Sequence, residues 1–317
     1  SNAVSLSLTA FASCKRRRAM GRSFGAHGHR MLFSSLIPLV SCRFAGGALL
    51  RVSSPRCFSS LRGGAGASPL HKPVKCVIFD KDGTLISFHH TWSPWADRLI
   101  ERLVKRCAAS GVCDERSIRS EVAETLGYDL DQRCVRGESS LLAWAAQPLI
   151  YDAIRKCLED RLGLLPDDAA AATHTCWSEC DGKEEVVALS NNTQELLSRL
   201  RARGIKIAVC TSDARVPTEA NLASLGIVAL VDEIVCGDDA SNVPKPAPDN
   251  ILNICKKLGV LPIQTIMIGD TNADLKMALA SNAGLSVAVL SGVGSRQDLS
   301  PNAHVILNSI DEVESLL

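Results

Sequence analysis

The chain has 317 residues, enough for one large domain or two small ones. Apolar residues make up 46% and charged residues 22%, which excludes disorder of the whole chain, and an aromatic share of 4% disfavours a stacking platform for nucleic acid. The net charge of +1 conceals a division, because the first acidic residue is Asp80 and residues 1–79 carry only basic charges. The acidic remainder disfavours binding to a nucleic-acid backbone, so we expect no nucleic-acid partner.

The basic N-terminal segment is typical of an organellar transit peptide. Ser1-Asn2-Ala3 has no initiator methionine and matches the remnant of a removed tag. Residues 4–70 are rich in Arg and Ser and contain no acid. The longest apolar stretch, residues 31–42, is too short for a bilayer, which needs about 20 apolar residues, so no membrane span is expected. We expect a disordered leader for mitochondria, with plastid or cytoplasmic location as alternatives; an uncleaved basic tail or an incorrect gene start also stays open.

From residue 74 onward, short apolar runs alternate with segments of helical periodicity. The runs are nearly continuous in Val, Ile and Leu, which is typical of parallel strands covered on both faces. This alternation predicts an α/β fold with a doubly wound, parallel, Rossmann-like sheet. Strands are predicted at residues 74–79, 205–210, 233–236, 265–268, 285–290 and 305–307, with helices at residues 192–203, 217–225, 248–258 and 272–280.

A long and largely helical segment separates the first predicted strand from the second. Ser93 and Pro94 are suited to the N-cap and first position of a helix, after which apolar residues recur every four positions from Trp95 to Cys107. Further helices are predicted at residues 116–126, 139–162 (with a break at Pro148 as one option) and 168–180. The predicted domains are a leader at residues 1–70, an α/β core at residues 71–86 and 190–317, and an inserted helical cap at residues 87–189.

The 13 cysteines are interpreted as reduced and mostly buried thiols. No CxxC pair occurs, and a disulfide framework is typical of much shorter chains. A zinc site at His174, Cys176 and Cys180 is disfavoured, because zinc sites normally take four ligands with paired spacing.

Carboxylate, hydroxyl and ammonium groups follow four of the predicted strands, where open α/β sheets bind ligands. Two carboxylates two residues apart after the first strand can divide the work of nucleophile and proton donor. A simple turn is the alternative there, because Asp-Gly is common turn chemistry. The residues concerned are Asp80 and Asp82, then Thr211 and Ser212, then Lys245 between two prolines, and finally Asp270 and Asp274.

These four elements, in this order, resemble the haloacid-dehalogenase superfamily, and specifically its phosphatases. The stretch FDKDGTL at residues 79–85, followed by a helical insertion, is similar to the phosphoglycolate-phosphatase branch. The resemblance extends over residues 74–317. It implies a Mg²⁺-dependent phosphatase that hydrolyses a small, phosphoglycolate-like phosphomonoester through an aspartyl-phosphate. The acid at position 82 separates the phosphatases and mutases of the superfamily from its dehalogenases.

The resemblance also implies a role for each site residue. Asp80 would be the nucleophile, and Asp82 would protonate the leaving alkoxide and then activate water. Thr211 and the Ser212 N–H would hold phosphoryl oxygens, while Lys245 would offset negative charge. Mg²⁺ would be held by Asp80, the Asp82 carbonyl and Asp270, with Asp274 supporting the metal or orienting Lys245. The predicted substrate contacts are Gly83, Thr84, Ser212 and Arg136.

A cap placed after the first strand favours a small phosphorylated metabolite over a phosphoprotein. Arg136 lies in a loop, residues 136–140, that reaches the substrate or is only a turn; both options stay open. Residues 89–92 either line the entrance or pack the first cap helix, and Asp213 and Arg215 are equally ambiguous. A phosphomutase and a non-catalytic binding protein are the alternative functions, and the sequence does not determine the oligomeric state.

Overall fold

The computed structural model describes residues 73–109, 111, 113–180 and 185–317. The leader predicted at residues 1–70 lies outside the described residues, so its assignment as a transit peptide stays a prediction. Within the described part of the chain, no helix combines the length and the apolar character needed to cross a membrane.

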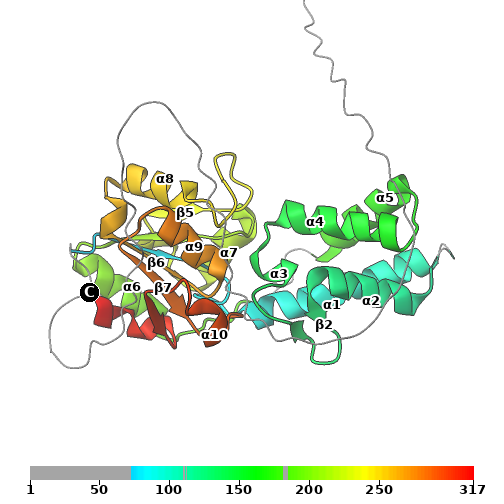
Figure 1. The fold of residues 1–317 in the computed structure, drawn as a ribbon, viewed down its shortest axis with the longest axis horizontal. Helices are drawn as coiled ribbons and strands as arrows, with labels where there is room; N and C mark the ends of the chain where they lie inside the picture. The colour runs from blue at the N-terminus through cyan, green and yellow to red at the C-terminus, as the bar shows by residue number, and fades with distance from the viewer. Residues whose placement is uncertain (1–72, 110, 112, 181–184) are drawn as a thin grey trace, which may run out of the picture. The chain divides into compact units, whose positions relative to one another are not determined.

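Six parallel strands form one sheet, which confirms the predicted α/β fold (Figure 1). The strands are β1 (Cys76–Phe79), β4 (Lys206–Cys210), β5 (Glu233–Val235), β6 (Thr265–Gly269), β7 (Leu285–Val289) and β8 (Val305–Leu307). Their order in the sheet is β5-β4-β1-β6-β7-β8, so β1 lies between β4 and β6. Phe79 at the end of β1 is paired with Val209 and with Ile268. The segments that follow these three strands therefore leave the sheet side by side.

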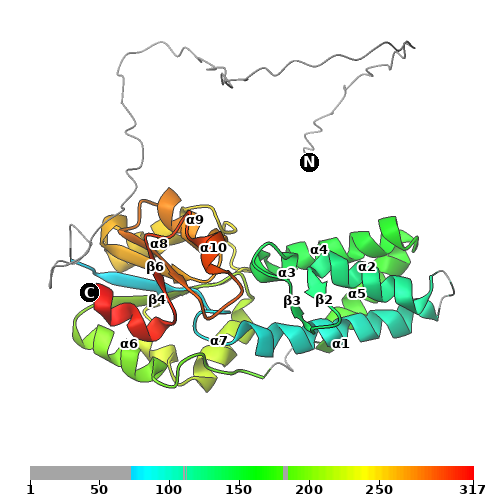
Figure 2. The same ribbon diagram turned by 60° about the horizontal axis from the view of Figure 1, so that its bottom comes forward.

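Helices cover both faces of this sheet, as the continuous apolar runs predicted. In β1, Val77 and Phe79 belong to one hydrophobic cluster, while Cys76 and Ile78 belong to another on the opposite face. Figure 2 shows α6 (Thr193–Ala202) and α7 (Arg215–Ser224) on one side, and α8 (Asp249–Leu258) and α9 (Asn272–Ala280) on the other. The core also contains α10 (Arg296–Leu299) and 3₁₀ turns at Val228–Leu230, Pro262–Gln264 and Ile310–Leu316.

The helical insertion has a hydrophobic cluster of its own, separate from the clusters of the sheet. This packing supports the proposed cap at residues 87–189, whose boundaries stay a prediction. Its elements are α1 (Phe88–Ala108), α2 (Glu115–Leu126), β2 (Tyr128–Asp129), β3 (Cys134–Val135), α3 (Leu141–Trp144), α4 (Gln147–Lys156), a π-helical turn (Cys157–Arg161) and α5 (Pro166–Cys180).

Three details of the insertion differ from the sequence prediction. The helix predicted to begin at Ser93 begins at Phe88, with Pro94 inside it, because burial of Phe88 and Trp92 offsets the hydrogen bond that Pro94 cannot donate. The predicted helix 139–162 is divided at residues 145–146, and Pro148 lies in the first turn of α4. The short antiparallel pair β2–β3 has no periodic signal in the sequence and was not predicted.

The chain segments that lead into and out of the insertion pair with each other. Ser87 N–H donates to the Val187 carbonyl at 2.8 Å, and Leu189 N–H donates to the Leu85 carbonyl at 3.1 Å. These bonds tie both connections together a few residues beyond the end of β1.

Eight of the ten cysteines among the described residues are buried, as predicted. Their reduced state stays a prediction. Cys176 and Cys180 pack in the hydrophobic cluster of the insertion, and His174 forms no metal-binding group with them within the described part of the chain.

Candidate active site

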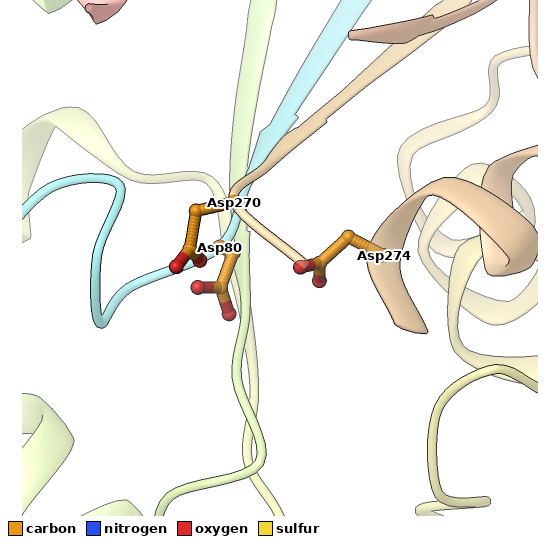
Figure 3. Close-up of side chains that lie close together, drawn as sticks. All are labelled: Asp80, Asp270 and Asp274. Atoms are coloured by element: carbon orange, nitrogen blue, oxygen red, sulfur yellow. The ribbon is translucent and has the colours of Figure 1, made fainter. Parts of the chain in front are cut away.

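Three carboxylates meet at the carboxyl end of the sheet, as Figure 3 shows for Asp80, Asp270 and Asp274. Asp80 follows β1, and its N–H continues the sheet by donating to the Ile268 carbonyl at 2.8 Å. Asp270 follows β6, and Asp274 lies in the first turn of α9. All three are buried, and one oxygen of each lies within 4.8 Å of the other two. Three of the four predicted metal ligands are thus brought together.

Lys245 places its ammonium between two of these carboxylates. Its Nζ lies 2.7 Å from Asp80 Oδ1 and 2.6 Å from Asp274 Oδ1. Burial alone would lower the pKa of Lys245, but Asp274 and Asp80 outweigh burial and raise the pKa, so the side chain stays protonated. Asp274 is itself held by Thr271, whose hydroxyl donates to Asp274 Oδ2 at 2.6 Å. Asp274 and Asp80 therefore hold the Lys245 ammonium between them.

The three carboxylates of Asp80, Asp270 and Asp274 outnumber the single ammonium group, that of Lys245, that lies among them. Burial raises the pKa of Asp80 to about 7, with Lys245 opposing the rise and Asp274 adding to it. Burial also raises the pKa of Asp270, and Asp80 and Asp274 add to that rise. Asp270 Oδ2 accepts a hydrogen bond from Val293 N–H at 2.8 Å, whereas Asp270 Oδ1 is buried without a partner. A fully buried oxygen without a partner, beside two further carboxylates, fits a divalent cation with oxygen ligands such as Mg²⁺.

Two glycines allow the backbone to close around Asp270. A Cβ at Gly83 would lie 2.3 Å from Asp270 Oδ2, and one at Gly292 would lie 1.9 Å from the same atom. Gly83 also has φ +81°, a conformation that favours glycine. Gly83 thus supports Asp270, rather than lining the pocket beside Asp80 as the sequence led us to expect.

Asp82 faces a different cation from Asp80, and this cation was not among the predicted residues. Lys81 is completely buried, and its Nζ lies 2.9 Å from Asp82 Oδ2 and 2.8 Å from Asp213 Oδ2. Burial raises the pKa of Asp82, which Lys81 opposes and Asp213 reinforces. Asp82 Oδ1 is buried and has no partner. The only sequence signal for Lys81 was a charged residue directly after an apolar strand, which does not indicate its partners.

The pocket beside Asp80 contains the other predicted phosphate contacts. Thr211 and Ser212 line it, together with Asp82 and Lys245. The Thr211 hydroxyl accepts a hydrogen bond from Asp213 N–H at 3.1 Å. Thr84 is buried but does not line the pocket.

Arg136, like Gly83 and Thr84, is a predicted substrate contact that does not line the pocket. Its guanidinium pairs with Glu124 on the surface of the insertion and lies outside the lining of the pocket. The pairing arises because Glu124 is on α2, which ends just before the hairpin that positions Arg136. Of the predicted loop, Glu138 reaches the core: Asn272 donates to its carboxylate from its N–H at 2.7 Å and from Nδ2 at 2.6 Å.

The insertion supplies the apolar wall of the pocket. Trp92 packs against Phe88 in the hydrophobic cluster of the insertion and also lines the pocket, so both alternatives for this residue apply together. His89 and His90 are exposed. Gln147 Nε2 donates to Asp213 Oδ1 at 2.8 Å, and the Ser212 hydroxyl donates to the Trp144 carbonyl at 3.2 Å. The lining residues from the insertion are Phe88, Trp92, Leu142, Ala143, Trp144, Ala145, Gln147 and Ile150.

Residues 74–282 match the haloacid dehalogenase-like hydrolase family. This range contains all the acidic side chains of the site. The chain belongs to this family. The haloacid dehalogenase-like chain is 28% identical over 251 residues to the validoxylamine A 7'-phosphate phosphatase of Streptomyces hygroscopicus subsp. limoneus, covering 75% of this chain and 95% of that protein. It is 29% identical over 236 residues to the phosphoglycolate phosphatase of Rhodospirillum rubrum, covering 71% of this chain and 83% of that protein.

The fold of this haloacid dehalogenase-like hydrolase is also found among solved structures. A predicted phosphoglycolate phosphatase from Haemophilus somnus 129PT superposes with a TM-score of 0.53 at 18% identity. The superposition covers 78% of this chain and 99% of that one. This likeness concerns the fold, which therefore includes the helical insertion as well as the sheet.

Proposed function

We propose that the protein is a Mg²⁺-dependent phosphatase that hydrolyses a small phosphomonoester through an aspartyl-phosphate on Asp80. The observation that carries this proposal is the position of Lys245, 2.7 Å from Asp80 and 2.6 Å from Asp274, beside the group of three carboxylates. An ammonium at that point offsets the charge of an incoming phosphate and keeps Asp80 oriented. The relatives named as phosphatases support the same reaction.

In the proposed first step, an Asp80 oxygen attacks phosphorus and the bond from phosphorus to the substrate oxygen breaks. Asp82, in its protonated form, donates a proton to the departing alkoxide. In the second step, Asp82 takes a proton from water, whose oxygen attacks phosphorus and releases phosphate, regenerating the Asp80 carboxylate. The raised pKa of Asp82 suits a group that must carry a proton in one step and accept one in the other.

Residues around the phosphoryl group would stabilise its charge. The Thr211 hydroxyl and the Ser212 N–H are the proposed donors, because both residues line the pocket at the end of β4. Asp80, Asp270 and the Asp82 carbonyl would hold Mg²⁺, with Asp274 orienting Lys245. When bound, the metal supplies positive charge that reduces repulsion between phosphate and carboxylates, which is about 4 kcal/mol per charge pair at 4 Å.

Phosphoglycolate is one candidate among small phosphate esters, since one of the similar proteins is named for it. The proposed location is mitochondrial, on the basis of the acid-free composition of residues 1–79.

The proposal is tested by phosphate release from p-nitrophenyl phosphate and from phosphoglycolate, with Mg²⁺ or EDTA. Asp80→Asn should abolish release in both cases, because an amide does not attack phosphorus. Asp80→Asn should still fold, since the amide keeps the shape of the side chain and removes a buried charge. Transfer to an added sugar phosphate without phosphate release would indicate the phosphomutase alternative. Binding of phosphate esters without turnover would indicate the non-catalytic one.

A further inference from the structure

The two ends of the pocket beside Asp80 differ in polarity. The end at Asp80, here called the phosphate end, is charged, and the end formed by the insertion, here called the cap end, is apolar. Among the described residues that line the pocket, Lys245 is the only cationic side chain. Its Nζ is already shared by Asp80 and Asp274 at the phosphate end. The cap end presents five large apolar side chains, namely those of Phe88, Trp92, Leu142, Trp144 and Ile150.

The two arginines for which the sequence left a substrate contact open have other partners in the structure. Arg136 pairs with Glu124 in the insertion. Arg215 pairs with Asp239 at 2.7 Å and with Glu219 at 3.0 Å. Neither guanidinium lines the pocket, so neither meets a carboxylate of a substrate bound at Asp80.

The apolar wall is also fixed in position by its own packing. Trp92 lies between Phe88, with ring centres 6.4 Å apart, and Trp95, with ring centres 5.6 Å apart. Trp95 in turn contacts Trp177 of α5 with ring centres 5.0 Å apart. Of the five wall residues, Phe88, Trp92, Leu142 and Ile150 are buried members of the hydrophobic cluster of the insertion, whereas Trp144 is exposed and does not belong to it. Most of the apolar surface is therefore held in place by the core of the insertion.

The cap end of the pocket offers no positive charge to a second anionic group on the substrate. Within the described residues, the two ammonium groups at or next to the pocket, those of Lys81 and Lys245, are each paired with two carboxylates, and the proposed Mg²⁺ site lies at the phosphate end. A carboxylate on the leaving group would lose water at the apolar wall without gaining a cation. An uncharged alcohol with a carbon-rich or aromatic face would instead bury that face against Trp92 and its neighbours.

We propose that the substrates are phosphomonoesters of uncharged, partly apolar alcohols, and that phosphoglycolate, whose leaving alcohol carries a carboxylate, is disfavoured. This inference rests on the proposed phosphatase function and specifies its substrate class. The observation behind it is the absence of any cation, among the described lining residues, beyond the one committed to Asp80.

Four phosphate esters with the same CH₂–O–phosphate linkage distinguish the effect of substrate charge on hydrolysis from the effect of substrate size. Phosphoglycolate and 2-hydroxyethyl phosphate form a small pair, and 4-carboxybenzyl phosphate and benzyl phosphate form an aromatic pair. The full chain with Mg²⁺ should show kcat/KM about 10- to 100-fold higher for the uncharged member of each pair. Equal values within a pair, or a preference for the carboxylate, would overturn the proposal.

A charge placed on the cap side tests the physical cause. Ala143 lines the pocket and is only half-buried, so it accepts a longer side chain. Ala143→Lys should raise the ratio of phosphoglycolate to 2-hydroxyethyl phosphate hydrolysis by about tenfold. Ala143→Met adds a side chain of similar length without charge and should keep the wild-type ratio. An equal shift in both variants would contradict the electrostatic explanation.

The experiment distinguishes an incorrect substrate class from an incorrect phosphatase function. If phosphoglycolate is hydrolysed best and Asp80→Asn removes the activity, the phosphatase function stands and the substrate class is wrong. If none of the four esters releases phosphate above the Asp80→Asn background, the phosphatase function and the substrate class derived from it both fail.

Discussion

Lys81 and Asp213 form a buried ion pair in which Lys81 Nζ lies 2.8 Å from Asp213 Oδ2. The same Nζ lies 2.9 Å from Asp82 Oδ2, so one ammonium holds the proposed proton donor and Asp213 together. Asp213 also accepts a hydrogen bond from Gln147 of α4. Asp82 is therefore connected to the insertion through Lys81, Asp213 and Gln147.

Lys81→Met should destabilise the protein by about 3–5 kcal/mol, because it leaves two carboxylates without their buried counter-charge. It should also lower kcat by about tenfold or more, since Asp82 loses the contact that positions it. Urea unfolding and kcat on p-nitrophenyl phosphate measure the two effects. In the double variant Lys81→Met with Asp213→Asn, much of the lost stability should return while kcat stays low. Full recovery of kcat in the double variant would show that Lys81 has a structural role alone.

Asp270→Asn should stabilise the metal-free protein at pH 8 and remove its response to Mg²⁺. The pKa values of Asp270 and Asp80 are raised in the folded state, that of Asp80 from 3.8 to about 7. Between these pH values the folded state binds more protons than the unfolded state, so stability falls as pH rises. An amide at position 270 does not titrate, so the variant should be more stable than the wild type at pH 8, with a smaller difference at pH 5.

The melting temperature with EDTA and with Mg²⁺, at pH 5 and pH 8, measures this effect. The wild type should gain more from Mg²⁺ at pH 8 than at pH 5, because the metal binds ionised carboxylates. Asp131→Asn removes an exposed carboxylate on the hairpin and is the matched control. A Mg²⁺ response in Asp270→Asn equal to that of the wild type would exclude Asp270 as a ligand.

Gly292→Ala should weaken Mg²⁺ binding about 10- to 100-fold, because the added Cβ would lie 1.9 Å from Asp270 Oδ2 and must displace it. Gly259→Ala is the control: it has φ +68° and no other atom within 4 Å of the added Cβ. That variant should lose about 1 kcal/mol of stability from backbone strain alone, with unchanged Mg²⁺ affinity. Titration calorimetry with Mg²⁺ compares the two, and equal affinities would contradict the prediction.

Glu138→Ala should raise KM for small phosphate esters about tenfold. Its carboxylate accepts two hydrogen bonds from Asn272, which together with the Gln147–Asp213 bond connect the insertion to the core. Glu124→Ala removes an exposed carboxylate that pairs with Arg136 inside the insertion and should leave KM within about twofold. Steady-state kinetics of both variants on p-nitrophenyl phosphate provides the comparison. A similar KM in the two variants would show that substrate binding does not depend on the contact between Glu138 and Asn272.

The order of the elements was available from the sequence because each depends on local patterns. Apolar runs such as residues 74–79 predicted strands buried on both faces, and the sheet has Val77 and Cys76 in clusters on opposite sides. The acids at strand ends were predicted to meet because parallel strands place their carboxyl ends at one edge. Asp80, Asp270 and Asp274 do lie within reach of one cation.

Side-chain partners were decided only by the tertiary structure. Arg136 was expected to face the substrate, yet the hairpin places it beside Glu124, and Glu138 contacts the core instead. Lys81 gave no sign of its two partners, because Asp213 is far away in the chain and is brought close only by the pairing of β1 with β4. The sequence by itself determined the sheet, the carboxylates at its edge and the family. The charge balance of the pocket and the apolar wall that faces it depend on contacts between distant segments, which local patterns do not encode.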